Sequence, residues 1–264
     1  MTELSRVSSG NIPDINKRTL DWYFDKIVQY LVFLSGISAI ILIIGIFAFV
    51  TMEGFGFLLE DFSLKEFLLS PWWEPTDDDE PTYGILALIA GTASVTGLAM
   101  LIAIPFSLGS AVYIAEFATG KKREYLKILV ELLAAIPSVV WGFIGLSIMN
   151  PLIIEFFDVP VGLNILNAGI ILGLMAAPIM TSISEDALKA VPDKYREAAE
   201  AMGATRWQVI YKTILPAAKN GLLGAVLLGV GRGFGETMAV LMATGHAINI
   251  PGSVFDSVRA LTAT

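Results

Sequence analysis

The stretch that decides the fold is YGILALIAGTASVTGLAMLIAIPFSLGSAVYIA, residues 83–115. No charged residue interrupts it, whereas a bilayer core about 30 Å thick needs only ~20 apolar residues in a helix. With a rise of about 1.5 Å per residue, the run is longer than one crossing requires. Pro105 lies inside it and predicts that the helix bends or splits there. We therefore expect one membrane span followed by a helical continuation.

Four more apolar runs of comparable length accompany it. They are Ile27–Thr51, Leu126–Met149 with Pro137, Leu166–Ser184 with Pro178, and Asn220–Ile248, which contains Arg232 and Glu236. Runs without polar alternation favour helices, because inside lipid only helices and closed barrels satisfy every backbone hydrogen bond. The sequence thus predicts an all-α, polytopic integral membrane bundle with five spans. Five crossings from a cytoplasmic start leave Thr264 outside, so we expect a sixth span to be missing after it.

The composition agrees with a membrane protein and argues against several other classes. Hydrophobic residues make up 55% of the chain and charged residues 16%, below the ~25% usual in soluble domains. With no cysteine and one histidine, the chain offers neither a disulfide framework nor a thiolate or histidine-rich metal centre. We therefore expect no metal site. The net charge of −8 argues against a nucleic-acid partner.

The basic residues predict the orientation. They gather before residue 27, between 121 and 127, and between 189 and 219, whereas the intervening segments 52–82 and 150–165 contain only Lys65. Because cytoplasmic loops carry the excess of Lys and Arg, the amino terminus and the 185–219 segment are predicted to be cytoplasmic. The expected organisation is a cytoplasmic tail at 1–26, an anchor span with an acidic external loop at 27–82, and a membrane core at 83–264.

Residues 193–216, DKYREAAEAMGATRWQVIYKTILP, form a charged patch between two apolar runs, here called the elbow. Its signals are a helix cap at Asp193, a left-handed stop at Gly203, a capping box from Thr205 to Gln208, and a bend at Pro216. Two short helices are therefore expected, tied stiffly to the fifth span. They suit either an amphipathic connector lying at the lipid surface or a docking element for another protein.

Arg232 and Glu236 lie within the fifth apolar run, in the sequence GVGRGFGETMAV of residues 229–240. A charge in mid-bilayer costs roughly 2.5–3.5 kcal/mol, so both side chains should be paired or face protein or water. Four residues apart, they are expected on one helix face. One interpretation is a structural ion pair. The other is an anion path in which the Arg232 fork binds a phosphate-like oxyanion and Glu236 tunes or gates it.

Other polar residues give weaker signals. Gly120-Lys121-Lys122 lacks the glycine spacing and the hydroxyl of a phosphate-binding loop, so any ATP hydrolysis is expected on another chain, and we expect no catalysis here. The acidic run 77–80 is predicted to be a solvated outer loop. Glu131 is expected to reach lipid headgroups or to pair with Lys127, four residues before it.

The elbow also resembles a known signature. Glu197-Ala198-Ala199, then Gly203, then Thr213-Ile214-Leu215-Pro216 is similar to the "EAA" pattern of ABC importer permeases, with Thr213 where the family prefers isoleucine. In that family the elbow is the coupling helix, which is seated in a cleft of the cytoplasmic ATPase. The resemblance implies a type I ABC importer transmembrane domain, with a coupling role for six residues: Glu197, Ala198, Ala199, Gly203, Leu215 and Pro216.

A narrower resemblance concerns the permease subunit of phosphate-specific importers of the PstC type. It rests on Gly231-Arg232 with Gly235–Val240, on Glu131–Gly142, and on Tyr83-Gly84 leading to Ile104-Pro105. It implies an inner-membrane subunit that pairs with a sister permease, two ATPase subunits and an external phosphate-binding protein. ATP and Mg would bind the ATPases, this chain would need no cofactor, and Arg232 and Glu236 would line the translocation path.

Two alternatives remain open from the sequence. The transported oxyanion could be sulfate or molybdate instead of phosphate. A secondary transporter with Glu236 as a proton site is the other, although such folds often carry inverted repeats and the sequence shows no repeated half.

Overall fold

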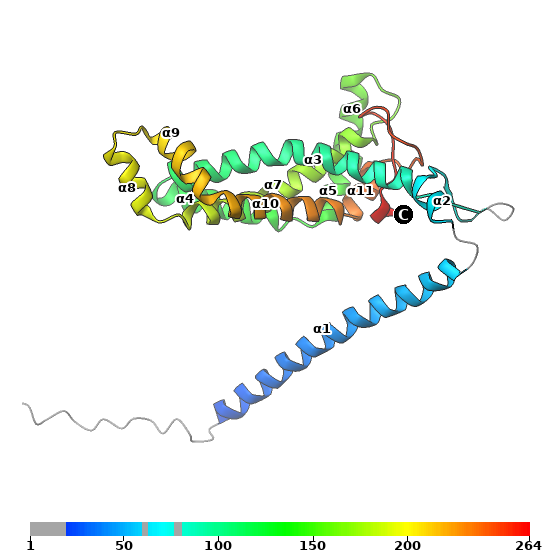
Figure 1. Cartoon of the computed structure of the whole chain (residues 1–264), viewed down its shortest axis with the longest axis horizontal. Helices are drawn as coiled ribbons and strands as arrows, with labels where there is room; N and C mark the ends of the chain where they lie inside the picture. Colours follow the sequence, from blue (N-terminus) through cyan, green and yellow to red (C-terminus); the bar gives the residue numbers. More distant parts are fainter. Residues whose placement is uncertain (1–19, 60–62, 77–80) are drawn as a thin grey trace, which may run out of the picture. The chain divides into compact units, whose positions relative to one another are not determined.

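The computed structural model describes residues 20–59, 63–76 and 81–264, and the chain divides into two compact units between Phe62 and Ser63 (Figure 1). In the first unit, helix α1 (Leu20–Leu59) contains the whole predicted span Ile27–Thr51. Its large apolar side chains are exposed between Trp22 and Phe55, as expected of a helix that lipid surrounds. Of the predicted tail 1–26, the part up to residue 19 lies outside the described residues, and so does the acidic run 77–80.

The second unit is built around three long helices that pack side by side. They are α3 (Leu86–Val112), α7 (Ile165–Lys189) and α10 (Leu215–Phe234). Small residues let the backbones approach: a Cβ on Gly173 of α7 would lie 3.0 Å from the Ala99 carbonyl oxygen of α3. The main apolar core lies between these helices and includes Leu172, Met175 and Met180.

The second unit has two distinct ends. Figure 1 shows α8 (Asp193–Ala201) and α9 (Arg206–Val209) together at one end, here called the elbow end. The opposite end, here called the far end, holds α2 (Leu64–Leu69), α6 (Asn150–Phe157) and α11 (Met238–Ala243). A two-residue ribbon leads into α3: β1 (Trp73–Glu74) pairs antiparallel with β2 (Thr82–Tyr83), with Trp73 opposite Tyr83.

The count of five spans agrees with the structure, whose described part has five helical segments long and apolar enough to cross a membrane. The predicted bounds of the third span were wrong. Leu126–Met149 crosses a break at residues 135–137 between α4 (Gly120–Ala134) and α5 (Ser138–Ile144). The apolar segment of spanning length is Ser138–Phe157, which continues through the π turn η2 (Gly145–Met149) into α6. Pro137 disfavours helical geometry at the residue before it. The charged residues of the predicted span, Lys127 and Glu131, both lie in α4.

The fifth span was also predicted at the wrong position. It begins with α9, continues through the π turn η3 (Ile210–Ile214) into α10, and ends at Phe234, so Asn220–Ile248 is not one helix. Glycines alternate through residues 229–235, and each costs a helix about 1 kcal/mol relative to alanine. A short connection then leads to α11. The described chain ends in the single turn η4 (Leu261–Ala263).

Two prolines at which a bend or a break was predicted do not break their helices. Pro105 lies inside α3, which continues unbroken to Val112 and then into the π turn η1 (Tyr113–Phe117). Pro216 does not interrupt the helix either, because it stands in the first turn of α10, directly after η3. A wide π turn before proline removes the clash between its ring and the carbonyl four residues back.

Candidate functional site

The elbow forms the two short helices that its local signals predict. Gly203 ends α8 with φ +79°, and its N–H donates to the Glu200 carbonyl at 2.8 Å. Thr205 and Gln208 make the predicted capping box at the start of α9. Asp193 behaves differently from the prediction: it is the first residue of α8 and accepts a hydrogen bond from Arg196 Nη1 at 3.0 Å instead of capping the helix.

The six residues with the implied coupling role divide into two groups. Glu197, Ala198, Gly203 and Pro216 are exposed, whereas Ala199 and Leu215 are half-buried. The half-buried pair packs against a second apolar cluster at the elbow end, made of Ala111, Leu188, Val191, Val209, Ile214 and Ala218. This cluster joins the elbow to α3, α7 and α10. The exposed group faces outward, available to another protein.

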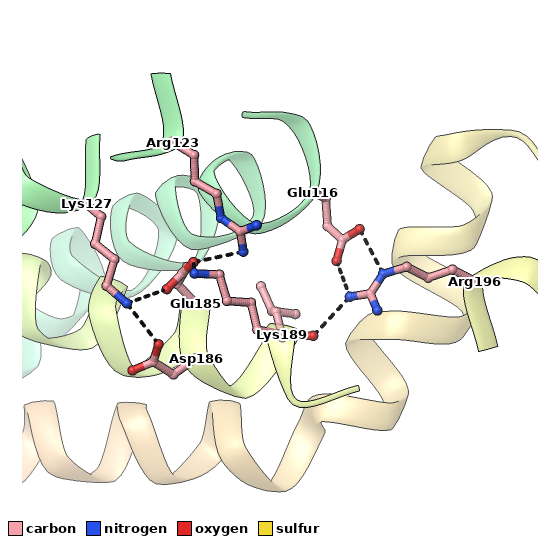
Figure 2. Close-up of polar contacts among 8 residues, drawn as sticks. Glu116, Arg123, Lys127, Glu185, Asp186, Lys189 and Arg196 are labelled. Atoms are coloured by element: carbon pink, nitrogen blue, oxygen red, sulfur yellow. Dashed lines mark hydrogen bonds and ion pairs between the residues drawn. The ribbon is translucent and has the colours of Figure 1, made fainter. Parts of the chain in front are cut away.

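Arg196 holds the elbow to two other segments (Figure 2). Its Nη2 and Nε donate to the two Glu116 oxygens at 2.7 and 3.3 Å, and Glu116 lies in η1 at the end of α3. The same guanidinium donates to the carbonyls of Leu188 at 3.1 Å and Val191 at 2.7 Å. The hydrogen bonds to Glu116 are the main cause of a pKa of Arg196 raised above its ordinary value. The Arg196 guanidinium is therefore fixed in place by hydrogen bonds to several acceptors.

Arg206, in α9, reinforces this contact. Its guanidinium donates to the Glu116 carbonyl and lies 4.9 Å from the centroid of the Phe117 ring. A cation over an aromatic face contributes roughly 0.5–1 kcal/mol at an exposed site. Both helices of the elbow thus contact the last turn of the α3 segment.

A second cluster of charges surrounds Glu185, near the end of α7 (Figure 2). Its carboxylate is 2% exposed and lies 3.3 Å from both Arg123 Nη2 and Lys127 Nζ, which come from α4, and it also pairs with Lys189. The prediction that Glu131 could pair with Lys127 was wrong: Lys127 instead bonds Glu185 and Asp186. The hydrogen bond that Lys127 donates to the Asp186 carboxylate is the main cause of a pKa of Lys127 raised above its ordinary value.

The far end contains Glu236, but not in the geometry predicted. Because α10 ends at Phe234, Glu236 lies in the connection to α11, and it does not share a helix face with Arg232. Its carboxylate accepts from the Ala239 N–H at 3.3 Å, and its carbonyl accepts from the Thr262 hydroxyl at 2.8 Å. The side chain is buried, and Thr92 and Thr96 lie near it around a gap too narrow to hold a water molecule.

Arg232 is exposed on the last turn of α10. Among residues 20–59, 63–76 and 81–264, no salt bridge joins it to Glu236 or to another carboxylate. The structural ion pair that the sequence left open is therefore not formed within the described chain. The same part of the chain contains no group of three or more His, Cys, Asp and Glu residues suited to a metal ion.

Comparison with known proteins places the chain in a family. Residues 103–257 match the model of a protein family that is described as "Binding-protein-dependent transport system inner membrane component". The chain belongs to this family. The matched region holds the elbow, the Glu185 cluster, Arg232 and Glu236.

Individual relatives from other organisms are similar to this chain over most of its length. The probable ABC transporter permease protein YqgH of Bacillus subtilis is 44% identical over 206 residues, which is 78% of this chain and 66% of that protein. The phosphate transport system permease protein PstC of Haemophilus influenzae is 35% identical over 72% of this chain and 65% of that protein. The chain thus spans less than two thirds of the length of these two relatives.

Among solved structures, an inward-facing MetNI methionine ABC transporter chain is 23% identical over 55% of this chain and 69% of that chain. Its TM-score is 0.47, which is too low for a comparison of conformations.

The candidate site contains several residues that sequence reasoning did not single out. Glu116, Arg123, Glu185 and Arg196 make contacts across the sequence: Arg196 bonds a residue 80 positions away, and Arg123 one 62 positions away. The one available signal was that Glu116 and Glu185 stand at the ends of apolar runs, where an acidic residue beside lysines and arginines favours an ion pair.

Proposed function

We propose that this chain is the transmembrane permease subunit of an ATP-driven ABC importer that moves inorganic phosphate across the cytoplasmic membrane. The observation that carries the proposal is one continuous helical path, from α9 through η3 to α10, that joins the elbow to the turn bearing Arg232. The PstC relatives, which are named phosphate transport permeases, support the choice of substrate.

The elbow is the surface for an ATPase subunit. Its exposed Glu197, Ala198 and Gly203 stand on two short helices whose geometry is set by a left-handed glycine and a capping box. Movement imposed on a short, stiff element is passed to the helix that continues from it. ATP and Mg bind the two ATPase subunits, where hydrolysis occurs, and this chain acts as a non-catalytic component.

The remaining partners follow from exposed surfaces and from the family. Leu223, Leu227 and Leu228 of α10 are exposed, as are Leu101 and Phe106 of α3, and such faces suit lipid or a sister permease. An external phosphate-binding protein delivers the anion at the face opposite the elbow. The chain lies in the cytoplasmic membrane as a multi-pass protein with its amino terminus in the cytoplasm.

Arg232 provides the contact for the anion. An arginine without a carboxylate partner in the described chain keeps its five N–H donors available, and its planar fork matches the oxygens of phosphate. The buried Glu236, one short connection away, adds a negative charge that limits how tightly an anion is held. Weak retention matters, because a tightly bound anion would not be released.

The test is uptake of radiolabelled phosphate into proteoliposomes that contain the complete complex, with and without ATP. We expect ATP-dependent uptake that proton uncouplers leave unchanged and that excess sulfate or molybdate does not inhibit. Uptake without ATP that uncouplers abolish would favour the secondary transporter. Inhibition by sulfate or molybdate would favour another oxyanion.

Arg232→Gln tests the role of the arginine. We expect at least a tenfold loss of uptake, because one charge-assisted hydrogen bond to a charged group contributes about 1.5–3 kcal/mol. The complex should still assemble, since the Arg232 side chain makes no salt bridge within the described residues. Arg232→Lys is the matched control: it keeps the charge but loses the bidentate fork, and we expect an intermediate loss. Near-normal uptake by Arg232→Gln would remove Arg232 from the path.

A further inference from the structure

We propose that Arg196 and Glu116 are positioning residues that transmit movement of the elbow to α3 and α7. This inference rests on the proposed function and adds to it a second route. In the first route, the elbow continues covalently through η3 into α10. The second route is the contact between Arg196 and Glu116, here called the joint.

The hydrogen bonds of Arg196 carry the argument. A guanidinium has five N–H donors, and Arg196 uses one for each of five hydrogen bonds. Nε and Nη2 donate to the two oxygens of Glu116, Nη2 also to the Leu188 carbonyl, and Nη1 to the Val191 carbonyl and to Asp193. One side chain therefore connects η1 at the end of α3, the last turn of α7, and α8.

The joint is partly shielded from water. The side chain of Arg196 is 20% exposed and that of Glu116 is 10% exposed. Such shielding strengthens a charge pair relative to one fully in solvent. A bidentate pair of arginine and carboxylate also fixes the relative orientation of its two partners, which a lysine does not do.

The joint is needed because α3 has no nearby covalent link to the elbow. Glu116 and Arg196 are 80 positions apart, so movement of α8 reaches α3 only through noncovalent contacts. Apolar contacts in the elbow-end cluster, such as those of Ala111 and Val209, are not directional and permit sliding. The joint supplies the directional contact, and Arg206 adds a second hold on Glu116 through its carbonyl.

At the elbow end, two different connections therefore carry movement to two different helices. An ATPase subunit that moves the elbow displaces α10 directly and displaces α3 through the joint. Because α3 and α7 pack closely along the core, both move with it. If the joint is loosened, the elbow moves without carrying α3, and hydrolysis is separated from transport.

The test measures phosphate transported per ATP hydrolysed in proteoliposomes containing the complete complex, with Arg196→Lys and Glu116→Gln. We expect ATP hydrolysis to continue while phosphate transported per ATP falls by about tenfold, within the range of coupling between sites. The matched control is Glu124→Gln, since Glu124 is exposed on α4 and no salt bridge joins it to another described residue. It should leave the ratio unchanged.

A cross-link separates coupling from a purely structural role. The chain has no cysteine, so Glu116→Cys with Arg196→Cys introduces a unique pair that a short bismaleimide can join. We expect the double variant to be uncoupled before cross-linking and to recover much of its phosphate-to-ATP ratio afterwards, because the reagent restores a tie between η1 and α8. A cross-linked complex that stays uncoupled would overturn the proposal.

The two proposals fail in different ways. If the complex with the unaltered chain shows no ATP-dependent phosphate uptake, the proposed function is wrong. If that complex is active, but Arg196→Lys and Glu116→Gln keep the normal ratio, only the joint is wrong. A parallel loss of assembly and hydrolysis in both variants would also overturn it, since that result shows a structural contact alone.

Discussion

The two ends of the second unit differ in whether their shielded carboxylates have ion-pair partners. At the elbow end, each buried carboxylate meets cations within the described chain: Glu185 meets Arg123, Lys127 and Lys189, and Glu116 meets Arg196. At the far end, Glu236 is 9% exposed and no salt bridge reaches it from the described residues. Glu185 and Glu116 at the elbow end thus have their ion-pair partners within one chain. At the far end, Glu236 instead contacts a backbone N–H and a threonine hydroxyl.

The largest effect should follow from breaking the ion pairs of the elbow end. Glu185→Ala leaves three cations clustered without their buried partner, and loss of one side of a buried pair costs about 3–5 kcal/mol. Because each cation is about a third exposed, water offsets part of this, and we expect a loss of about 2–3 kcal/mol. The measurement is the apparent Tm of the purified complex in detergent.

Asp186→Ala is the matched control for that prediction. Asp186 is the adjacent residue, also contacts Lys127 at 3.2 Å, and is 62% exposed. An exposed pair contributes about 0–1 kcal/mol, so its removal should lower the apparent Tm far less. Equal losses in the two variants would show that the burial of Glu185 has no part in stability, and the contrast between the two ends would fail.

The far end should instead be sensitive to backbone spacing. A Cβ on Gly91 of α3 would lie 2.5 Å from the Arg259 carbonyl oxygen, whereas a Cβ on Gly97 in the same helix would meet nothing within 4 Å. We expect Gly91→Ala to cost about 1–3 kcal/mol, as overpacking does. Gly97→Ala should be neutral or stabilising by up to about 1 kcal/mol. The check is the apparent Tm of both variants; similar values would show that the 259 segment can move away freely.

Local signals in the sequence predicted the elbow well, and hydropathy predicted the number of spans. The left-handed Gly203 and the capping box at Thr205 depend on residues within a few positions of each other, so the pattern contains what determines the geometry. Hydropathy reports only that a segment can lie in lipid. It did not show the break before Pro137 or the end of α10 at Phe234, because both interrupt apolar sequence.

Rules that consider one residue and its near neighbours do not account for the remaining differences. Pro137 breaks a helix while Pro105 and Pro178 are accommodated inside helices, and single-residue rules are the same for all three. Likewise, nothing near Arg196 in the sequence indicates Glu116 as its partner, because the two meet only when α3 and the elbow pack together. The predicted shared helix face of Arg232 and Glu236 failed because it assumed that the helix continues past Phe234, where α10 ends.

The smallest effect should come from Thr96, and it tests whether the far end is complete without a partner. The Thr96 hydroxyl is buried near Glu236 and has no hydrogen-bond partner among the described residues, whereas the Thr181 hydroxyl of α7 donates to the Ala177 carbonyl at 2.8 Å. An unpaired buried hydroxyl costs about 1–3 kcal/mol, so Thr96→Val should leave the apparent Tm unchanged or raise it by a few degrees.

Thr181→Val should lower the apparent Tm slightly, because it removes a formed hydrogen bond of about 1 kcal/mol. The two substitutions are chemically identical, and both sites are buried in the same helical bundle. Their difference therefore reports hydrogen bonding alone. If Thr96→Val lowers the apparent Tm of the assembled complex as much as Thr181→Val does, the Thr96 hydroxyl has an acceptor there that the described chain lacks. Its neighbour Glu236 would then lie where another subunit or a bound group supplies hydrogen bonds.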